Sequence, residues 1–316
     1  MSPKPFTLAM VVPCYNEEEV LPTTINELEK LLDRLKSKGL VDEKSFICFV
    51  DDGSRDRTWE LIQEEAVKPH IKGLKLSRNY GHQNALLAGL FYAEGLCDAA
   101  VSMDADLQDD ISVVEQMCQK YQKGYEIVYG VRKRRDTDTL FKRITAEGFY
   151  KVMRFMGVDI IENHADFRLM SKRALFWLKE FEEVNLFLRG IIPLLGLKSD
   201  KVYYDRKERL AGESKYPLKK MLAFAWDGIT SFSVAPLRLI TFLGIAVLVV
   251  SLLLSIWAIL AKISGQAVSG WTSMMLIVLF LGGVQMLSIG IIGEYIGKIY
   301  KETKRRPRFF VEKIEG

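Results

Sequence analysis

A repeated pattern of short apolar runs, polar clusters and helical segments organises the first 110 residues. Four apolar runs of strand length occupy residues 6–12, 45–50, 73–76 and 98–103. Each ends in a polar cluster, and segments with helical spacing of apolar residues separate the runs. Strands that alternate with helices predict right-handed βαβ units and a mostly parallel sheet covered by helices on both faces. Ligands bind beyond the carboxyl ends of such strands, so we expect the four clusters at one edge of the sheet.

The fourth cluster, residues 101–110, ends its strand on two carboxylates separated by one residue. If the extended geometry persists past the strand, Asp104, Asp106 and Gln108 share a face. Three oxygen donors at that spacing suit Mg²⁺ or Mn²⁺, which keep open positions for phosphate. An acidic turn that caps the next helix is the alternative.

The chain lacks the glycine-rich phosphate loops of other doubly wound folds. The first strand-to-helix turn is Pro-Cys-Tyr-Asn-Glu at residues 13–17 and not G-x-G-x-x-G, and no G-x-x-x-x-G-K-[ST] segment occurs. The absence of these glycine-rich motifs argues against a Rossmann dehydrogenase. A bound diphosphate would instead be neutralised by a metal at Asp104 and Asp106.

Several segments resemble one family. Residues 12–18, 50–56 and 104–109 together resemble the family 2 glycosyltransferases of GT-A fold. The resemblance continues in order through residues 78–81, 164–168 and 212–216 into the C-terminal apolar segments. It is closest to the polyprenyl-phosphate type, which includes the bactoprenol (undecaprenyl-phosphate) glucosyltransferases and dolichol-phosphate mannose synthase. Relatives often carry proline where this chain has Asp110, which leaves the metal ligands intact.

The resemblance implies roles for individual residues. It assigns the nucleotide sugar to Pro13, Tyr15, Glu17, Asp51, Asp52 and Asp104, and the metal to Asp104, Asp106 and Gln108. It assigns the acceptor lipid phosphate to Arg132, Arg143 and Ser214. The expected catalytic residues are Asp166, Asp106, Arg209 and Lys215, of which the two basic ones belong, with Ser214, to a loop suited to stabilising the leaving diphosphate. Arginine suits a bidentate phosphate contact.

The role of Asp166 is open between a base, a positioning group and a helix N-cap. In the relatives this aspartate faces the acceptor and is proposed as the base. A phosphomonoester has a second pKa near ~6 and is already largely deprotonated at pH 7. The acceptor therefore scarcely needs a base, and Asp166 could equally position the acceptor or the sugar hydroxyls.

The C-terminal third predicts membrane attachment. Residues 239–261 and 271–293 are uncharged for about the ~20 residues that a bilayer span needs, and a short loop joins them. Two buried core helices are the alternative, which this length and apolarity disfavour. Glycines in the second span allow close helix packing, within the pair or in a homo-oligomer. Basic residues follow the second span, which places the catalytic domain and both termini in the cytoplasm.

Two basic amphipathic segments precede these spans. Residues 140–157 predict a helix that lies in the headgroup plane or packs on the sheet, and residues 217–236 predict a juxtamembrane helix that ends at Pro236. The basic run at 131–136, which leads into the first of them, could also be a solvated loop. The expected organisation is a catalytic domain at 1–216, a juxtamembrane helix at 217–236, two spans within 237–294 and a basic tail at 295–316.

Charge and cysteine usage restrict the remaining possibilities. The net charge of +4 is too small to indicate a nucleic-acid partner. The four cysteines are widely spaced, as expected for reduced packing residues in a cytosolic portion, and the N-terminus lacks the apolar region of a signal peptide.

The expected reaction is metal-dependent, inverting transfer of a sugar from a nucleotide diphosphate sugar to polyprenyl phosphate at the inner or plasma membrane, for cell-envelope glycans. Likeness to O-antigen (lipopolysaccharide) glucosyltransferases favours UDP-glucose, with GDP-mannose, UDP-N-acetylglucosamine and UDP-amino-arabinose as alternative donors. A processive polysaccharide synthase would need a Q-x-x-R-W segment and more spans. A non-catalytic nucleotide-sugar sensor would not need the metal carboxylates, the basic run and the two spans together.

Overall fold

The computed structural model describes residues 4–133, 164–184, 187–205, 230, 233–264 and 270–316. The described residues fall into two compact units. The first unit lies within residues 1–150, 159–216 and 305–316, and the second within 151–158 and 217–304. The expected interfacial segment 140–157 lies outside the described residues, as does most of segment 217–236.

The first unit is built on a sheet whose central strands are parallel, as predicted. Its described strands are β1 (Leu8–Cys14), β2 (Phe46–Asp51), β3 (Ile71–Leu76), β4 (Ala99–Ser102), β5 (Ile127–Arg132), β6 (His164–Ser171), β7 (Ser199–Tyr204) and β8 (Val311–Glu315). They lie in the order β7-β5-β6-β4-β1-β2-β3-β8. Strand β1 pairs in parallel with β2 and β4, β2 with β3, and β5 with β7. Strands β6 and β8 run antiparallel to their neighbours.

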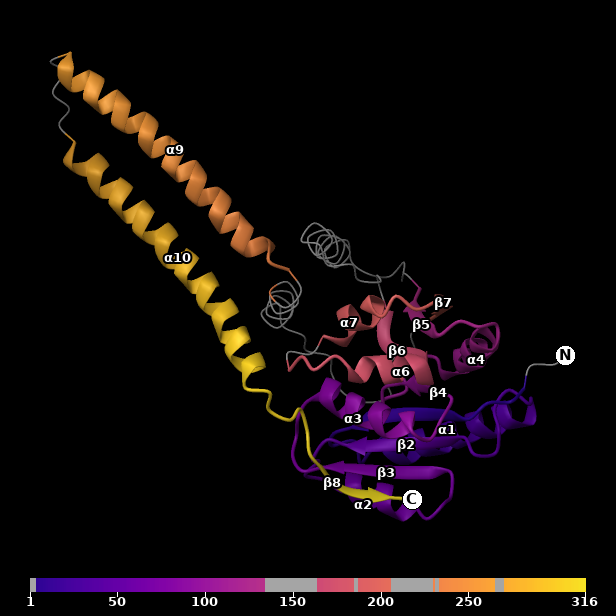
Figure 1. Ribbon diagram of the computed structural model, residues 1–316. Coiled ribbons are helices and arrows are strands. Elements are labelled where there is room, and N and C mark those ends of the chain that lie inside the picture. The colour runs from indigo at the N-terminus through magenta and orange to yellow at the C-terminus, as the bar shows by residue number, and fades with distance from the viewer. Residues whose placement is uncertain (1–3, 134–163, 185–186, 206–229, 231–232, 265–269) are drawn as a thin grey trace. The chain divides into compact units, whose positions relative to one another are not determined.

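Helices lie against this sheet in Figure 1. Each of them has buried apolar residues. They are α1 (Leu21–Ser37), α2 (Thr58–Glu65), α3 (His82–Glu94), α4 (Val114–Gln122), which follows the short 3₁₀ helix η1 (Ile111–Val113), α6 (Lys172–Lys179) and α7 (Leu188–Leu194). Helix α3 contacts β1, β2 and β4. The helix approaches the sheet closely at Gly89, where a Cβ would lie 2.4 Å from a methyl of Val11 and 2.7 Å from one of Val50. This close packing fixes the N-terminus of α3 beside the carboxyl ends of the central strands.

Strand β6 was not predicted, and Asp166 is not a helix N-cap. Asp166 lies within β6, between β4 and β5, and Ser171 caps α6 by accepting a hydrogen bond from the N–H of Ala174 at 3.1 Å. The strand alternates in the usual way, since Phe167 and Leu169 belong to the apolar core. Asp166 and Arg168 occupy the alternate positions, and their charge conceals the pattern in the sequence.

The end of the chain also differs from the predicted tail at 295–316. Helix α10 (Trp271–Thr303) continues to Thr303, and residues 311–315 form β8 antiparallel to β3. The N–H of Ser77 extends the pairing by donating to the carbonyl of Phe310 at 3.0 Å. The chain that leaves α10 therefore returns to the sheet of the first unit.

The second unit contains two long apolar helices, α9 (Ala235–Ile263) and α10, which contact each other and lie side by side in Figure 1. Segments Ala235–Leu254 and Phe280–Thr303 have mean hydropathies of 2.6 and 1.3 and are long enough to cross a membrane. The sequence predicted a helix that ends at Pro236, but Pro236 instead lies in the first turn of α9. Proline is tolerated there because the first turn has no intrahelical partner for its missing N–H.

Candidate active site

The first three polar clusters meet at the carboxyl edge of the sheet, as predicted. After β1, the N–H of Asn16 donates to the hydroxyl of Ser54 at 3.0 Å. After β2, Asp52 accepts hydrogen bonds from the N–H groups of Tyr80 at 2.7 Å and Gly81 at 2.9 Å. Backbone amides thus tie the loops together, which holds the shape of the site without using its exposed side chains.

The loop after β2 requires glycine at residue 53. Gly53 has a φ of +68°, and a Cβ there would lie 2.5 Å from the carbonyl carbon of Arg78. The loops after β2 and β3 therefore touch through their backbones. An alanine at this position would force them apart.

Asp51 offers an acceptor in this assembly. Its Oδ1 accepts from the N–H of Ser54 at 3.1 Å, while its buried Oδ2 has no partner among the described residues. Burial raises the pKa of this carboxyl, and its hydrogen bonds with Ser54 lower it only in part. A buried acceptor without a partner is satisfied when a ligand N–H reaches it. Of the other residues expected at the nucleoside, Pro13 is buried in β1, Tyr15 is exposed beyond it, and Glu17 donates its N–H to Thr58 at 2.8 Å.

The acidic cluster does not continue the extended geometry assumed from the sequence. Strand β4 ends at Ser102, and Leu107 has a φ of +48°. Asp106 Oδ1 accepts the N–H of Gln108 at 3.2 Å, because aspartate readily bonds the backbone two residues on. Asp104, Asp106 and Gln108 therefore come from a turn rather than from one face of a strand, and the Gln108 side chain is buried.

Negative charge accumulates around Asp104. Although 38% of its side-chain surface is exposed, desolvation by the surrounding protein raises the pKa of Asp104. His82 lowers it, with Nε2 at 3.6 Å from Asp104 Oδ1. Nearby carboxylates raise it again, namely Asp166, Asp109 and Asp106. Such a cluster favours a bound cation.

The carboxylates present fit a divalent ion that is shared with a substrate. Among the residues that the structure describes, no three His, Cys, Asp or Glu side chains are grouped closely enough to hold a metal by themselves. Mg²⁺ is commonly held by one or two carboxylates and completed by substrate phosphates and water. Asp104 and Asp106 are the two carboxylates available for this arrangement.

Asp166 is the centre of a second charged group. The fully buried Arg168 donates to its Oδ1, and Arg189 of α7 donates to its Oδ2 at 3.2 Å. His82 Nε2 lies 3.9 Å from Asp166 Oδ2 and so stands between this group and Asp104. Burial raises the pKa of Asp166, but the two arginines and His82 outweigh burial and hold it well below its usual range.

His82 and Arg189 are site residues that the sequence did not assign. His82 belongs to the third polar cluster and begins α3, so its place at the strand ends was visible in the order of motifs. Arg189 is the single charged residue in the apolar run 186–195. This isolated charge is the sequence signal that could have indicated a buried ion pair. Its partner lies in β6, the strand that the sequence concealed.

Arg132, expected at the acceptor phosphate, forms hydrogen bonds within the protein. At the end of β5 its Nη2 lies 3.0 Å from Oδ1 of the buried Asp109, and its Nε donates to the hydroxyl of Tyr204 at 3.3 Å. About 30% of the Arg132 side chain remains exposed. Arg143, Arg209, Ser214 and Lys215 lie outside the described residues.

Comparison with known proteins places this site in a family. Residues 9–176 match the model of Glycosyl transferase family 2, and residues 235–299 match the GtrB C-terminal hairpin. An uncharacterized glycosyltransferase of Bacillus subtilis, YkoT, is 55% identical over 96% of this chain and 91% of its own. The bactoprenol glucosyl transferase of Shigella phage SfX is 43% identical over 96% of this chain and 98% of its own. A crystal structure of glucosyl-3-phosphoglycerate synthase from Mycobacterium tuberculosis, 18% identical, covers 71% of this chain and 78% of its own at a TM-score of 0.45.

The matches to the two sequence relatives run through the sheet, its carboxyl edge and the paired apolar helices. The two sequence relatives, from Bacillus subtilis and from Shigella phage SfX, match over nearly the full length of both this chain and their own. The chain therefore belongs to glycosyl transferase family 2 and is a glycosyltransferase.

Proposed function

We propose that this enzyme transfers a sugar from a nucleotide diphosphate sugar to polyprenyl phosphate, with inversion at the anomeric carbon. The observation that carries the proposal is the placement of His82 between Asp104 and Asp166, at 3.6 and 3.9 Å. It puts a carboxylate cluster suited to a metal beside a group rich in arginine. Full-length similarity to bactoprenol glucosyl transferases supports a polyprenyl acceptor.

The donor would bind along the loops after β1, β2 and β4. The buried Asp51 Oδ2 accepts an N–H of the nucleoside base, and the backbone bonds of Asp52 keep the neighbouring loop in place. Asp104 and Asp106 would hold the divalent ion, with Gln108 as the expected third donor. When bound, that ion neutralises negative charge on the diphosphate.

The acceptor would meet the group around Asp166. A phosphomonoester is largely ionised at pH 7, so the chemistry asks for orientation and charge balance more than for a base. Asp166 holds Arg189 at 3.2 Å, and we assign this aspartate a positioning role toward the arginine. Arg132 and Arg143 would receive the lipid phosphate. One displacement at the anomeric carbon inverts its configuration, and no covalent enzyme intermediate is needed.

The setting is the cytoplasmic face of the plasma or inner membrane. Helices α9 and α10 would form two spans, and no part of either candidate segment is buried within the described protein. Because β8 follows α10 and pairs with β3, both ends of the two-helix pair lead to the same sheet. The donor that we propose is UDP-glucose, and the product would serve glycan modification of the cell envelope.

The test is an assay of the purified full-length enzyme with undecaprenyl phosphate against radiolabelled UDP-glucose, UDP-N-acetylglucosamine, GDP-mannose and UDP-amino-arabinose. We expect a lipid-linked product with UDP-glucose, which Asp106→Ala protein does not form. A product from another donor would correct the sugar but keep the reaction. Absence of lipid-linked product with every donor, under conditions in which a nucleotide sugar binds, would refute the acceptor.

A further inference from the structure

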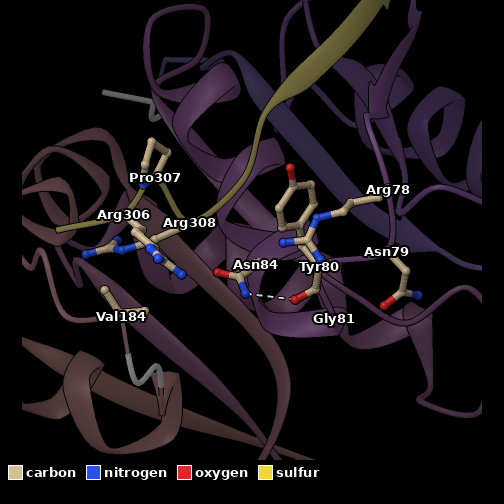
Figure 2. Close-up of a pocket in the computed structure, with 9 residues that line it drawn as sticks. All are labelled: Arg78, Asn79, Tyr80, Gly81, Asn84, Val184, Arg306, Pro307 and Arg308. Carbon is tan, nitrogen blue, oxygen red and sulfur yellow. Dashed lines mark hydrogen bonds between the residues drawn. The ribbon is translucent and has the colours of Figure 1, made fainter. Parts of the chain in front are cut away.

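A cationic cavity of about 450 Å³ lies beside the β3 end of the sheet. Two segments supply most of the lining labelled in Figure 2: the loop after β3 with the start of α3, which is the first wall, and the segment that joins α10 to β8, which is the second wall. Val184 completes the lining. Arg78 lines the first wall, and Arg306 and Arg308 line the second. None of the described residues that line it is acidic, and Arg78 and Arg306 come from different walls. Its size is that of a small-molecule site.

The walls are held in place by contacts that leave ligand-binding groups available. The guanidinium of Arg78 stacks on Tyr80, 4.3 Å from the ring centroid. Asn84 donates from Nδ2 to the Tyr80 carbonyl at 2.8 Å, as the dashed line in Figure 2 marks. The buried Oδ1 of Asn84 has no partner among the described residues. The cavity thus offers cations for a phosphate and one acceptor for a hydroxyl.

Strand β8, which the sequence did not predict, holds the second wall in place. Pairing of β8 with β3, together with the bond from Ser77 to Phe310, holds the segment that carries Arg306 beside the loop of Arg78. Arg308, which precedes β8 in the chain, donates to the carbonyl of Phe181 and so anchors the same segment at a second point. The arginines therefore belong to a built site and not to a loose tail.

The chain itself indicates where a ligand would come from. Arg306 is three residues past Thr303, the last residue of α10, and three extended residues span at most about 10 Å. Basic residues just beyond a membrane span attract anionic lipid headgroups. Lys298, Lys301, Lys304 and Arg305 lie in the same stretch. We therefore infer that the phosphate that binds in this cavity belongs to a membrane lipid.

We propose that this cavity binds the phosphate of an anionic membrane phospholipid whose headgroup carries a hydroxyl, such as phosphatidylglycerol. Arg78 and Arg306 contact the phosphate from the two walls, and Asn84 Oδ1 accepts the headgroup hydroxyl. The lining of the cavity does not include Asp104, Asp106 or Asp166, and the proposed lipid is not a substrate. It rests on the proposed membrane placement of α10, but its test measures lipid binding and not sugar transfer.

The test uses the full-length enzyme in detergent, titrated with short-chain phosphatidylglycerol and examined by native mass spectrometry, which resolves protein with and without a bound lipid. We expect saturable binding that weakens roughly tenfold or more in Arg78→Gln and in Arg306→Gln, each of which removes a charge-assisted contact. The matched control is Arg305→Gln, which removes the same charge from an exposed neighbour that does not line the cavity. Phosphatidylcholine should not bind in this way.

Three results would overturn the proposal. Equal weakening in Arg305→Gln would mean attraction to the general basic stretch. Inorganic phosphate that binds as tightly as the lipid would make this a free-phosphate site. Displacement of the lipid by UDP would make the cavity part of the donor site. Arg306 is exposed, so its variant remains informative if Arg78→Gln protein fails to fold.

Discussion

Arg189 and Asp166 are joined by a hydrogen bond of 3.2 Å, on a carboxylate that the buried Arg168 also binds. Burial raises the pKa of Asp166, yet the two arginines hold it well below its usual range. The carboxylate therefore stays ionised throughout the working pH range and is a weak base.

The pH dependence of transfer should accordingly follow the acceptor. We expect an acidic limb near pH ~6, where the phosphomonoester loses its second proton. Replacing polyprenyl phosphate by its thiophosphate, which has a lower second pKa, should move that limb to lower pH. Measuring kcat/KM from pH 5 to 8 with both acceptors checks this. A limb that stays in place with both acceptors would point to an enzyme group instead.

Asp166→Asn and Arg189→Gln should separate stability from activity. A carboxyl whose folded pKa is depressed stabilises the protein above its unfolded pKa of ~3.9, and this contribution is lost as pH falls through the folded pKa. At pH 7 the asparagine variant leaves Arg168 buried without its counter-charge, which costs about 3–5 kcal/mol. Arg189 is 34% exposed, so its glutamine variant should unfold near the wild-type temperature.

Both variants should lose at least about tenfold in transfer, because each removes the Arg189–Asp166 contact. Thermal unfolding followed by intrinsic fluorescence, beside lipid-dependent kinetics, checks the pair. If the asparagine variant is as stable as the wild type, the buried pair is not what holds β6. If the glutamine variant is fully active, Arg189 has no role in transfer.

The sequence predicted the elements whose apolar pattern is continuous. Strand β1 is buried at every position, and its short apolar run is typical of a strand of a parallel sheet that is covered on both faces. The placement of polar clusters at strand ends then follows from parallel topology, which is why the sequence placed Asp51 and Asp104 at the carboxyl edge of the sheet. Asp166 was proposed as a site residue only through resemblance, because a buried charged pair in β6 interrupts the apolar alternation.

Three features depend on hydrogen-bond partners that a linear pattern of apolar residues does not show. Strand β8 carries Glu312 and Lys313, as edge strands often do, and only the free edge of β3 makes it a strand. The reach of Arg189 to Asp166 joins α7 to β6 across 23 positions of the chain. The local turn at Asp106 also follows from a side-chain bond to Gln108, and so the assumed extended spacing was wrong.

Metal-dependent transfer should be abolished by Asp106→Asn as completely as by Asp106→Ala. Asparagine retains an acceptor for the N–H of Gln108, which Asp106 now binds at 3.2 Å, but it removes the charge. Both proteins should keep the wild-type unfolding temperature and lose transfer, while EDTA inactivates the wild type and added Mg²⁺ or Mn²⁺ restores it. Full activity of either variant in EDTA would refute the metal assignment.

Acceptor binding should depend on the two arginines in different ways. Arg143→Ala should raise the KM for polyprenyl phosphate by roughly ten- to a hundredfold, the value of one charge-assisted contact, with donor affinity unchanged. Arg132→Ala should in addition lower stability, since it leaves the buried Asp109 without its cation at 3.0 Å. Calorimetric titration of UDP-glucose beside lipid-dependent kinetics separates the two substrates. Loss of donor affinity with unchanged acceptor dependence would make Arg143 a diphosphate ligand.

Membrane topology can be read from single cysteines, because all four native cysteines are buried and should give little background labelling. Val67→Cys reports on the catalytic unit at a site that is 86% exposed. Glu312→Cys reports on β8, and Ser269→Cys reports on the connection between α9 and α10. A membrane-impermeant maleimide should label the first two only in inverted vesicles and the third only in right-side-out vesicles.

The labels at Val67 and Glu312 must agree, because β8 is hydrogen-bonded to β3. Labels on opposite sides at Val67 and Glu312 would mean that the strand does not pair in the membrane, and a Ser269 label on the same side as both would mean that the helices do not cross it.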